Sequence, residues 1–521
     1  MRLNRAKFHT QLVILSSVSV ALVLYLFEHL FYIPDKGKPY AVFLAPRFYG
    51  GMNDLSSEVF TQWSGLFTVF GLGLVVISLG LYLIFIKESR HMGIFVFISA
   101  VVMALSFQLL SPQGFGHLIE QSRSVNNGTI YSIGQILKDP NFSSVNPLEK
   151  IQYLFVEFGA NNSGYTIPGT THPPGWFLIV FAIAGIAKLI SFGSDLNTNL
   201  FYWGILVTLI NCTIAPIVLS ISKEIFGKKI GALSGVFLIL SPSAMMHFCA
   251  MADAIGTVFY ALAILQLIKI FNVLAQGVGE GRRINLKILT KVLFAGLYLT
   301  VAAQVAYSLI IPISALLLTT VILVGVLQRK MIEVVVGFIV PYFAYSACEA
   351  FLSSGKSFWL SRAFMITKDP IFSDLSILRP FPLAQIANFE IIFVMGGIFL
   401  LPSSILSLMA IFHTKLSLRV ISANQQEIKK NFVLYVWGLS TIALLLQSTA
   451  RLEVERVWHW YLMIGWIFSG FFILSLQQAL GKDSESSESE EERFSIIFIS
   501  GVLLLQFTCS LILGMSIQDY Y

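Results

Sequence analysis

Long apolar runs, separated by short polar connections, recur along almost the whole chain. An α-helix needs about 20 apolar residues to cross the roughly 30 Å hydrocarbon core of a membrane. Helices are expected there because lipid offers the backbone no hydrogen-bonding partners. The pattern therefore predicts an all-α, polytopic transmembrane bundle of about 13 helices, near residues 11–32, 64–86, 92–110, 200–221, 229–247, 253–273, 291–307, 310–327, 331–354, 390–413, 432–449, 457–476 and 494–515.

Composition agrees with a multi-pass integral membrane protein. Of the 521 residues, 56% are hydrophobic and 12% are charged, which is about half the charge of an average protein. The net charge of +6 does not indicate a nucleic-acid partner, because Lys and Arg cluster in short connections, as the positive-inside rule expects. The four cysteines lie in apolar segments without the spacing of a disulfide framework or a zinc site. The first apolar run is too long for a typical signal peptide and is expected to be retained.

The basic connections predict the orientation of the chain. More than half of its 34 Lys and Arg residues fall in six of them, between residues 2–7, 87–90, 223–229, 282–291, 329–330 and 415–430. Placing these in the cytoplasm, together with the N-terminus, puts other segments on the external or lumenal face. Those segments are 33–63, 111–173, 355–389 and 450–456, together with the helix start at Asp253.

Strict alternation of the crossings fails once. Between His172 outside and Lys223 inside lie two apolar stretches, 174–191 and 200–221. We expect 174–191 to be re-entrant or only partly buried, and the alternative is that the basic turn at 223–229 breaks the rule.

The predicted helices and external loops divide the chain into four parts. They are N-terminal transmembrane helices (1–110), an external loop (111–173), a transmembrane core with a second external loop at 355–389 (174–476), and an acidic loop with a final helix (477–521).

The external loop carries two candidates for chemistry. Glu120 lies shortly beyond a membrane exit, where a carboxylate is able to act as a general base or bind a divalent cation. By residue type alone, a solvated loop acid is the simpler interpretation. The loop ends in His172-Pro173-Pro174, a stiff entry that holds an imidazole at the mouth of a helix. Proline is also an ordinary first residue of a helix, so a bystander His remains an alternative.

Two further polar clusters lie at predicted helix ends. Pro242 breaks a helix, and Asp253 follows at the start of the next one. An acid there is functional by default, although capping of the helix dipole explains it equally well. The second cluster is the stretch 451–460, RLEVERVWHW, in which Arg456 is suited to bind phosphate through bidentate hydrogen bonds. Snorkelling charges in an aromatic belt are the alternative.

These motifs resemble the GT-C class of polytopic membrane glycosyltransferases. The resemblance is closest to relatives of the protein mannosyltransferases and the bacterial lipid-linked sugar transferases. Those families place an acid early in the first external loop and end the loop in His-Pro-Pro. They often continue with a Pro-rich helix end followed by an Asp, as Pro242 and Asp253 do here. Some bacterial members carry a late Gly-Glu-x-x-Arg-x-Trp motif, and residues 452–458 match all but its Gly.

The acid is the point at which this chain departs from the family. The families usually have Asp, or Asp-Glu, early in the loop, and here Glu120 takes that place. Three apolar stretches precede the His-Pro-Pro, where the family commonly has one before its catalytic loop. The loop 33–63, with Asp35, Asp54 and Glu58, therefore remains a rival source of the acid.

The resemblance implies transfer of a sugar from a polyprenyl-phosphate-linked donor to a glycan, lipid or protein acceptor at the external or lumenal face. The acid would deprotonate the acceptor hydroxyl, and an Arg held by a Glu would neutralise the departing lipid phosphate. No cofactor is implied and no metal ligands are assigned, although a divalent cation is compatible with the site. The implied catalytic residues are Glu120, His172 and Asp253, and the implied donor-phosphate residues are Glu453, Arg456, Trp458 and Arg379.

A secondary transporter or flippase for a lipid-linked or anionic substrate is the alternative function. That class predicts charged residues near helix centres and broken helices in paired positions. Here the polar clusters gather at one predicted face and the helix centres are almost uncharged, which favours the enzyme.

Overall fold

The computed structural model describes residues 63–85, 91–111, 114–120, 122, 149, 174–251, 253–276, 284–352, 392–393, 396–412, 425–446, 459–480 and 488–517. These residues form fifteen α-helices and no strand. The helices are α4 (Trp63–Phe85), α5 (Met92–Phe107), α10 (Pro174–Ile190), α11 (Leu196–Cys212), α12 (Ile214–Phe226), α13 (Lys228–Ile239), α14 (Pro242–His247), α15 (Asp253–Ala275), α16 (Leu286–Val305), α17 (Ile310–Thr320), α18 (Met331–Leu352), α22 (Leu400–Phe412), α23 (Gln425–Leu446), α25 (His459–Leu480) and α26 (Glu488–Ile517).

Nine of the described helical stretches are long and apolar enough to cross a membrane. The protein is therefore a multi-pass, all-α integral membrane protein, as the apolar runs predict. Three further apolar helices are shorter, and they lie within α10, in α17 with its π-helical extension, and in α22. The predicted first crossing, 11–32, lies outside the described residues.

Two predicted crossings differ in form. The run 229–247 is divided into α13 and the six-residue α14, because Pro242 begins a new helix and Ser241 caps it by accepting a hydrogen bond from Ala244 N. The run 200–221 belongs to a continuous 31-residue stretch, Leu196–Phe226. By contrast, α10 has only 17 residues, about 26 Å at 1.5 Å per residue, which is shorter than the hydrocarbon core.

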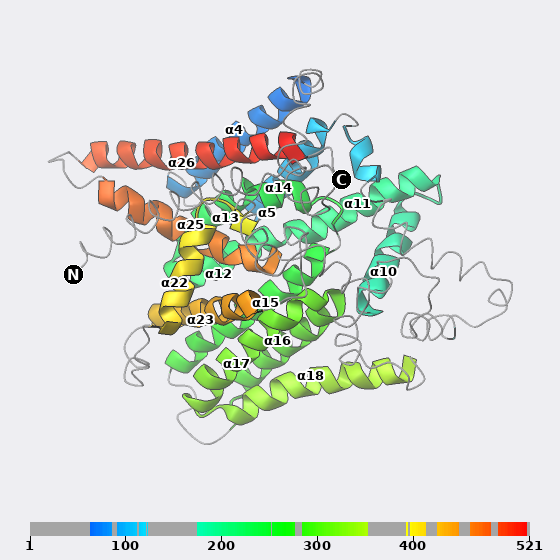
Figure 1. Cartoon of the computed structure of the whole chain (residues 1–521), viewed down its shortest axis with the longest axis vertical. Coiled ribbons are helices and arrows are strands. Elements are labelled where there is room, and N and C mark those ends of the chain that lie inside the picture. Colours follow the sequence, from blue (N-terminus) through cyan, green and yellow to red (C-terminus); the bar gives the residue numbers. More distant parts are fainter. Residues whose placement is uncertain are drawn as a thin grey trace, which may run out of the picture.

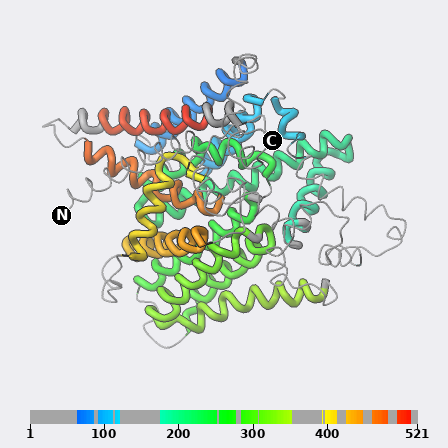
Figure 2. The backbone as a smooth tube through the Cα atoms, in the orientation of Figure 1, coloured from blue at the N-terminus to red at the C-terminus, as the bar shows by residue number. Residues whose placement is uncertain are grey.

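The two ends of the described chain pack together. Helices α4 and α26 lie side by side at the top of Figure 1, and the tube in Figure 2 shows the same arrangement. The ring of Phe507 lies over Gly73, where a Cβ would come within 2.1 Å of it. Small residues of this kind let membrane helices approach closely, so the final helix closes the bundle against the first described one.

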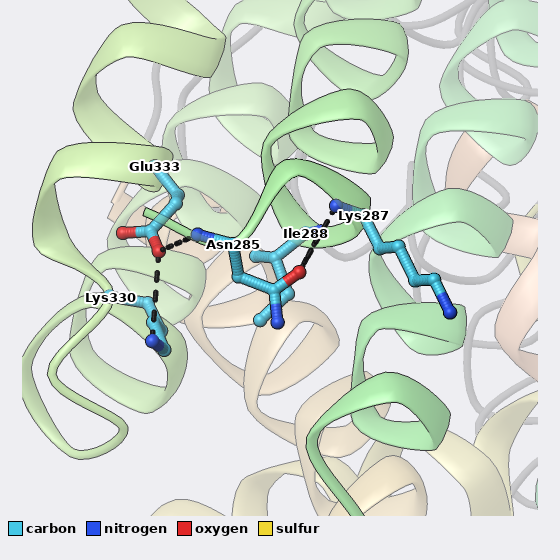
Figure 3. A network of polar contacts seen from close by, with 5 residues as sticks. All are labelled: Asn285, Lys287, Ile288, Lys330 and Glu333. Carbon is cyan, nitrogen blue, oxygen red and sulfur yellow. Dashed lines mark hydrogen bonds and ion pairs between the residues drawn. The ribbon is translucent and has the colours of Figure 1, made fainter. Parts of the chain in front are cut away.

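One end of the bundle gathers the basic connections. Asn285 caps α16 there by accepting hydrogen bonds from Lys287 N and Ile288 N. The Glu333 carboxylate, at the start of α18, accepts a hydrogen bond from Asn285 N at 3.0 Å and pairs with Lys330 at 3.7 Å (Figure 3). The hydrogen bond between Asn285 and Glu333 joins the starts of two neighbouring helices, and we refer to this side of the molecule as the basic end.

Helices α15 and α16 connect the basic end to the opposite end. On α16, the chain passes from the cap Asn285 to Gln304 in the last turn, and on α15 it passes back from Asp253 to Asn272. Each interval is 19 residues, or about 28 Å, close to the thickness of a hydrocarbon core. The starts of α10, α15 and α25 therefore lie about one membrane thickness away from the basic end, and we call that side the site end.

Candidate functional site

The structure describes only part of what the sequence singles out. Glu120 is described in full, and Asp253 is described as the first residue of α15. The other predicted site residues lie outside the described residues: His172, Arg379, Glu453, Arg456 and Trp458. The described residues that follow two of these clusters in the sequence are the start of α10 and the start of α25.

A buried turn leads into α15 and positions its first residue. Asn211 on α11 donates hydrogen bonds to the carbonyl oxygens of Phe248 and Met251, at 3.1 and 2.8 Å. Thr208, on the same helix, accepts one from Ala250 N at 3.3 Å. Ala250 has φ +54°, a left-handed conformation that few non-glycine residues adopt without support from their surroundings.

Non-helical backbone at membrane depth occurs only where protein or a water-filled cavity surrounds it. The turn 248–251 is fully buried. Its carbonyl and amide groups are satisfied by α11 side chains, which replace the hydrogen bonds that a continuous helix would supply. Two polar residues near the end of α11 therefore hold the turn from which Asp253 begins the next helix.

The short helix that carries Glu120 packs against α11 next to this turn. Leu118 lies over Gly204, where a Cβ would come within 2.7 Å of its side chain. Leu118 also shares a buried core with Cys249 and Ala250 of the turn. Glu120 itself is half-buried, so its carboxylate remains within reach of solvent.

His117 is buried beside Glu120. Burial lowers the pKa of the His117 imidazole, and the Glu120 carboxylate opposes this only in part. The imidazole is therefore neutral at pH 7.

The helix that follows His-Pro-Pro joins the same core. Trp176 of α10 is buried with Leu118 and Cys249. Gly175 lies against the last turn of α16, where a Cβ would come within 2.5 Å of the Gln304 side chain. The start of α10 is thus held between the Glu120 segment and the end of α16.

The fourth cluster is connected through a pair of buried histidines. The ring centroids of His247 at the end of α14 and His459 at the start of α25 are 5.6 Å apart. Phe248 packs edge-on against both His459 and Trp466. His459 follows the stretch 451–458 directly. The pair therefore joins the start of α25 to the turn before Asp253, although more than 200 residues separate the two histidines in sequence.

One carboxylate at the site end was missed by the sequence analysis. Glu349 is buried on α18, whereas its neighbours along the helix are exposed. It lies one helical turn beyond Tyr345, whose hydroxyl donates to the Gln304 side chain at 2.8 Å. Gln304 is the residue against which Gly175 packs.

A sequence signal for Glu349 exists. Residues at every fourth position of α18 form a stripe that is buried except at the half-buried Tyr345, and it begins and ends with a carboxylate: Glu333, Gly337, Pro341, Tyr345 and Glu349. Four-residue spacing places these side chains on one face. The acidic residue nearest the loop 355–389 is thus on the face that packs against α16.

The arrangement is suited to polar chemistry at a membrane face. It offers a half-buried carboxylate, a neutral imidazole, two further buried imidazoles and a buried carboxylate at one end of the bundle. Among the described residues, no group of three or more His, Cys, Asp or Glu side chains is placed to hold a metal ion. No protein-family model matches the chain, and no curated protein matches it significantly.

Proposed function

We propose that this protein is a membrane glycosyltransferase. It moves a sugar from a polyprenyl-phosphate-linked donor to a glycan, lipid or protein acceptor at the face opposite the basic end. By the positive-inside rule that face is external or lumenal. The proposal rests on the motif resemblance described above and on one structural observation.

The observation is the meeting of four polar segments at the site end. The Glu120 helix and the start of α10 share a core with the turn before Asp253, and His247 connects that turn to the start of α25. These segments come from positions between 116 and 460 of the sequence. Every multi-pass protein places its polar connections at a membrane face, but contact between segments so far apart in the sequence is what a transferase site requires.

In the proposed reaction, the acceptor hydroxyl attacks the anomeric carbon of the donor. The C–O bond to the lipid phosphate breaks, and the lipid phosphate leaves with that bond's electron pair. Glu120 takes the hydroxyl proton as general base. Arg456, held by Glu453 with Trp458 and Arg379 nearby, binds the departing phosphate, and His172 and Asp253 line the cleft.

The test is donor turnover by the purified protein in detergent. Radiolabelled polyprenyl-phosphate mannose, glucose and arabinose are offered, and release of the polyprenyl phosphate is measured. Wild type is compared with Glu120→Gln and Arg456→Ala. Removing a general base typically lowers turnover by roughly 10²–10⁴-fold. The matched control is Glu427→Gln, because Glu427 is in the first turn of α23, at the basic end, and this change should leave turnover unaltered.

The outcomes separate the proposal from its alternatives. Loss of turnover in both site variants supports the transferase and its assigned residues. If Glu120→Gln retains turnover, the general base is instead Asp54 or another acid of the loop 33–63. If no donor is cleaved, while proteoliposomes exchange intact lipid-linked sugar between leaflets, the protein is a flippase instead.

A further inference from the structure

A group of charges at the basic end is distinct from the proposed sugar-transfer site. Glu224, in the last turn of α12, accepts a hydrogen bond from the Asn272 side chain at 2.9 Å. The Lys429 ammonium group lies 3.3 Å from the same carboxylate oxygen and 3.1 Å from the Glu224 carbonyl oxygen. Lys429 is buried. One lysine and one amide therefore already satisfy this carboxylate.

Two more lysines on the α15–α16 hairpin lie near enough to interact electrostatically with the same carboxylate. Lys269 is six residues before the end of α15, and Lys291 is six residues after Asn285, the cap of α16. Both are therefore about 9 Å from the end of the hairpin. Both interact electrostatically with Glu224, and they also interact with each other.

Neither of these two lysines is neutralised by the described part of the chain. Both side chains are half-buried, and neither makes a hydrogen bond or an ion pair there. Three cations therefore surround one carboxylate, which leaves two positive charges at the boundary of the membrane. Like charges repel more strongly where water is scarce, so an anion placed between these two lysines would be stabilised there.

The available anion at this position is the phosphate of a lipid headgroup. Lysine buries its apolar stem and extends its ammonium group to the interface. Basic pockets between helices on the cytoplasmic side bind anionic headgroups. The basic end is the cytoplasmic one by the positive-inside rule, and the cytoplasmic leaflet is the one enriched in anionic lipid.

We propose that Lys269 and Lys291 form a binding site for the phosphate of an anionic phospholipid, seated between α12, α15 and α16. Lys429 and Glu224 form the wall of this site. The neutral pair that they make leaves the ammonium groups of Lys269 and Lys291 for the ligand. The site is about one membrane thickness away from the proposed catalytic face, and it does not depend on the sugar-transfer reaction.

Lipid retention by the purified full-length protein tests the site. The protein in neutral detergent receives phosphatidylglycerol or phosphatidylcholine, and bound lipid is counted by native mass spectrometry while thermal unfolding is recorded in parallel. Wild type should retain phosphatidylglycerol and unfold at a higher temperature with it. Lys269→Gln combined with Lys291→Gln should weaken retention roughly tenfold or more, from the contribution of each lysine near an anionic lipid.

Two variants serve as controls. Lys228→Gln combined with Lys287→Gln removes the same charge from exposed lysines at the same end and should leave retention unchanged. Glu224→Gln removes the negative charge that competes with the ligand and should raise retention. If both double-lysine variants lose lipid retention equally, the effect comes from general surface charge, and the proposed site is wrong. If inorganic phosphate stabilises the protein as much as phosphatidylglycerol does, the site binds a soluble anion, and the proposal of a lipid ligand is wrong.

Discussion

Asn211→Leu is expected to release the buried turn that precedes α15. Leucine keeps the same number and branching of side-chain heavy atoms but removes the two hydrogen bonds to the Phe248 and Met251 carbonyls, at 3.1 and 2.8 Å. Hydrogen bonds between membrane helices contribute about 0.6 kcal/mol on average and up to about 1.7 kcal/mol. The loss of two therefore predicts a decrease of roughly 1–3 kcal/mol in the free energy of unfolding.

The same change should also reduce donor turnover, since the turn determines where Asp253 stands. The measurement is unfolding by SDS titration in mixed micelles, followed by turnover at a temperature at which the variant remains folded. Ser510→Ala is the matched control, because it removes one buried hydrogen bond, 2.6 Å long, to the Leu240 carbonyl oxygen. It should cost up to about 1.7 kcal/mol and leave turnover unaltered.

Two results would refute this reasoning. If Asn211→Leu unfolds no more easily than wild type, the two hydrogen bonds do not hold the turn. If both variants lose turnover in proportion to their loss of stability, the turn has no special effect on the site.

Three further predictions follow from local features of the structure. Glu349→Gln should lower donor turnover with little change in stability, whereas Glu333→Gln should destabilise the protein with little change in turnover. Donor turnover and SDS titration measure both effects. Gly470→Ala should lower the free energy of unfolding by about 1–3 kcal/mol, because its Cβ would come within 2.3 Å of the Ile230 carbonyl oxygen; SDS titration checks this. Burial lowers the pKa of His117, so the unfolded state binds a proton more readily. Stability should therefore be full above the unfolded pKa, about 6.5, and decrease as pH falls below it; unfolding at pH 7.5 and 5.5 in wild type and His117→Gln checks this, and the variant should lose that part of the pH dependence.

The sequence predicted the fold class through the length of its apolar runs. Spans such as Met92–Leu110 and Arg493–Leu511 coincide closely with predicted runs, because covering a hydrocarbon core requires a minimum apolar length. Breaks within a single apolar run were predicted less well. The run 229–247 looks continuous by hydropathy, yet Pro242 and the capping Ser241 divide it.

The candidate site was predicted in its parts but not in its assembly. Glu120 and Asp253 stood out because charges are rare in this chain and both lie at predicted helix ends. Asn211 and Thr208 did not, because an uncharged polar residue within an apolar run gives no sign of whether it faces lipid, a neighbouring helix or a buried turn. Glu349 was missed because its spacing has meaning only once α16 is known to cover that face.

The sequence by itself therefore determined an all-α membrane bundle and the candidate polar segments at its helix ends. It also grouped the basic connections on one face, since the cost of placing charge in lipid constrains every loop separately. Only the tertiary structure decided that α11 holds the turn before Asp253, that His247 meets His459, and that Lys269 and Lys291 face one carboxylate. Those are contacts between distant segments, and an apolar run records how far a helix extends but not which helix lies beside it.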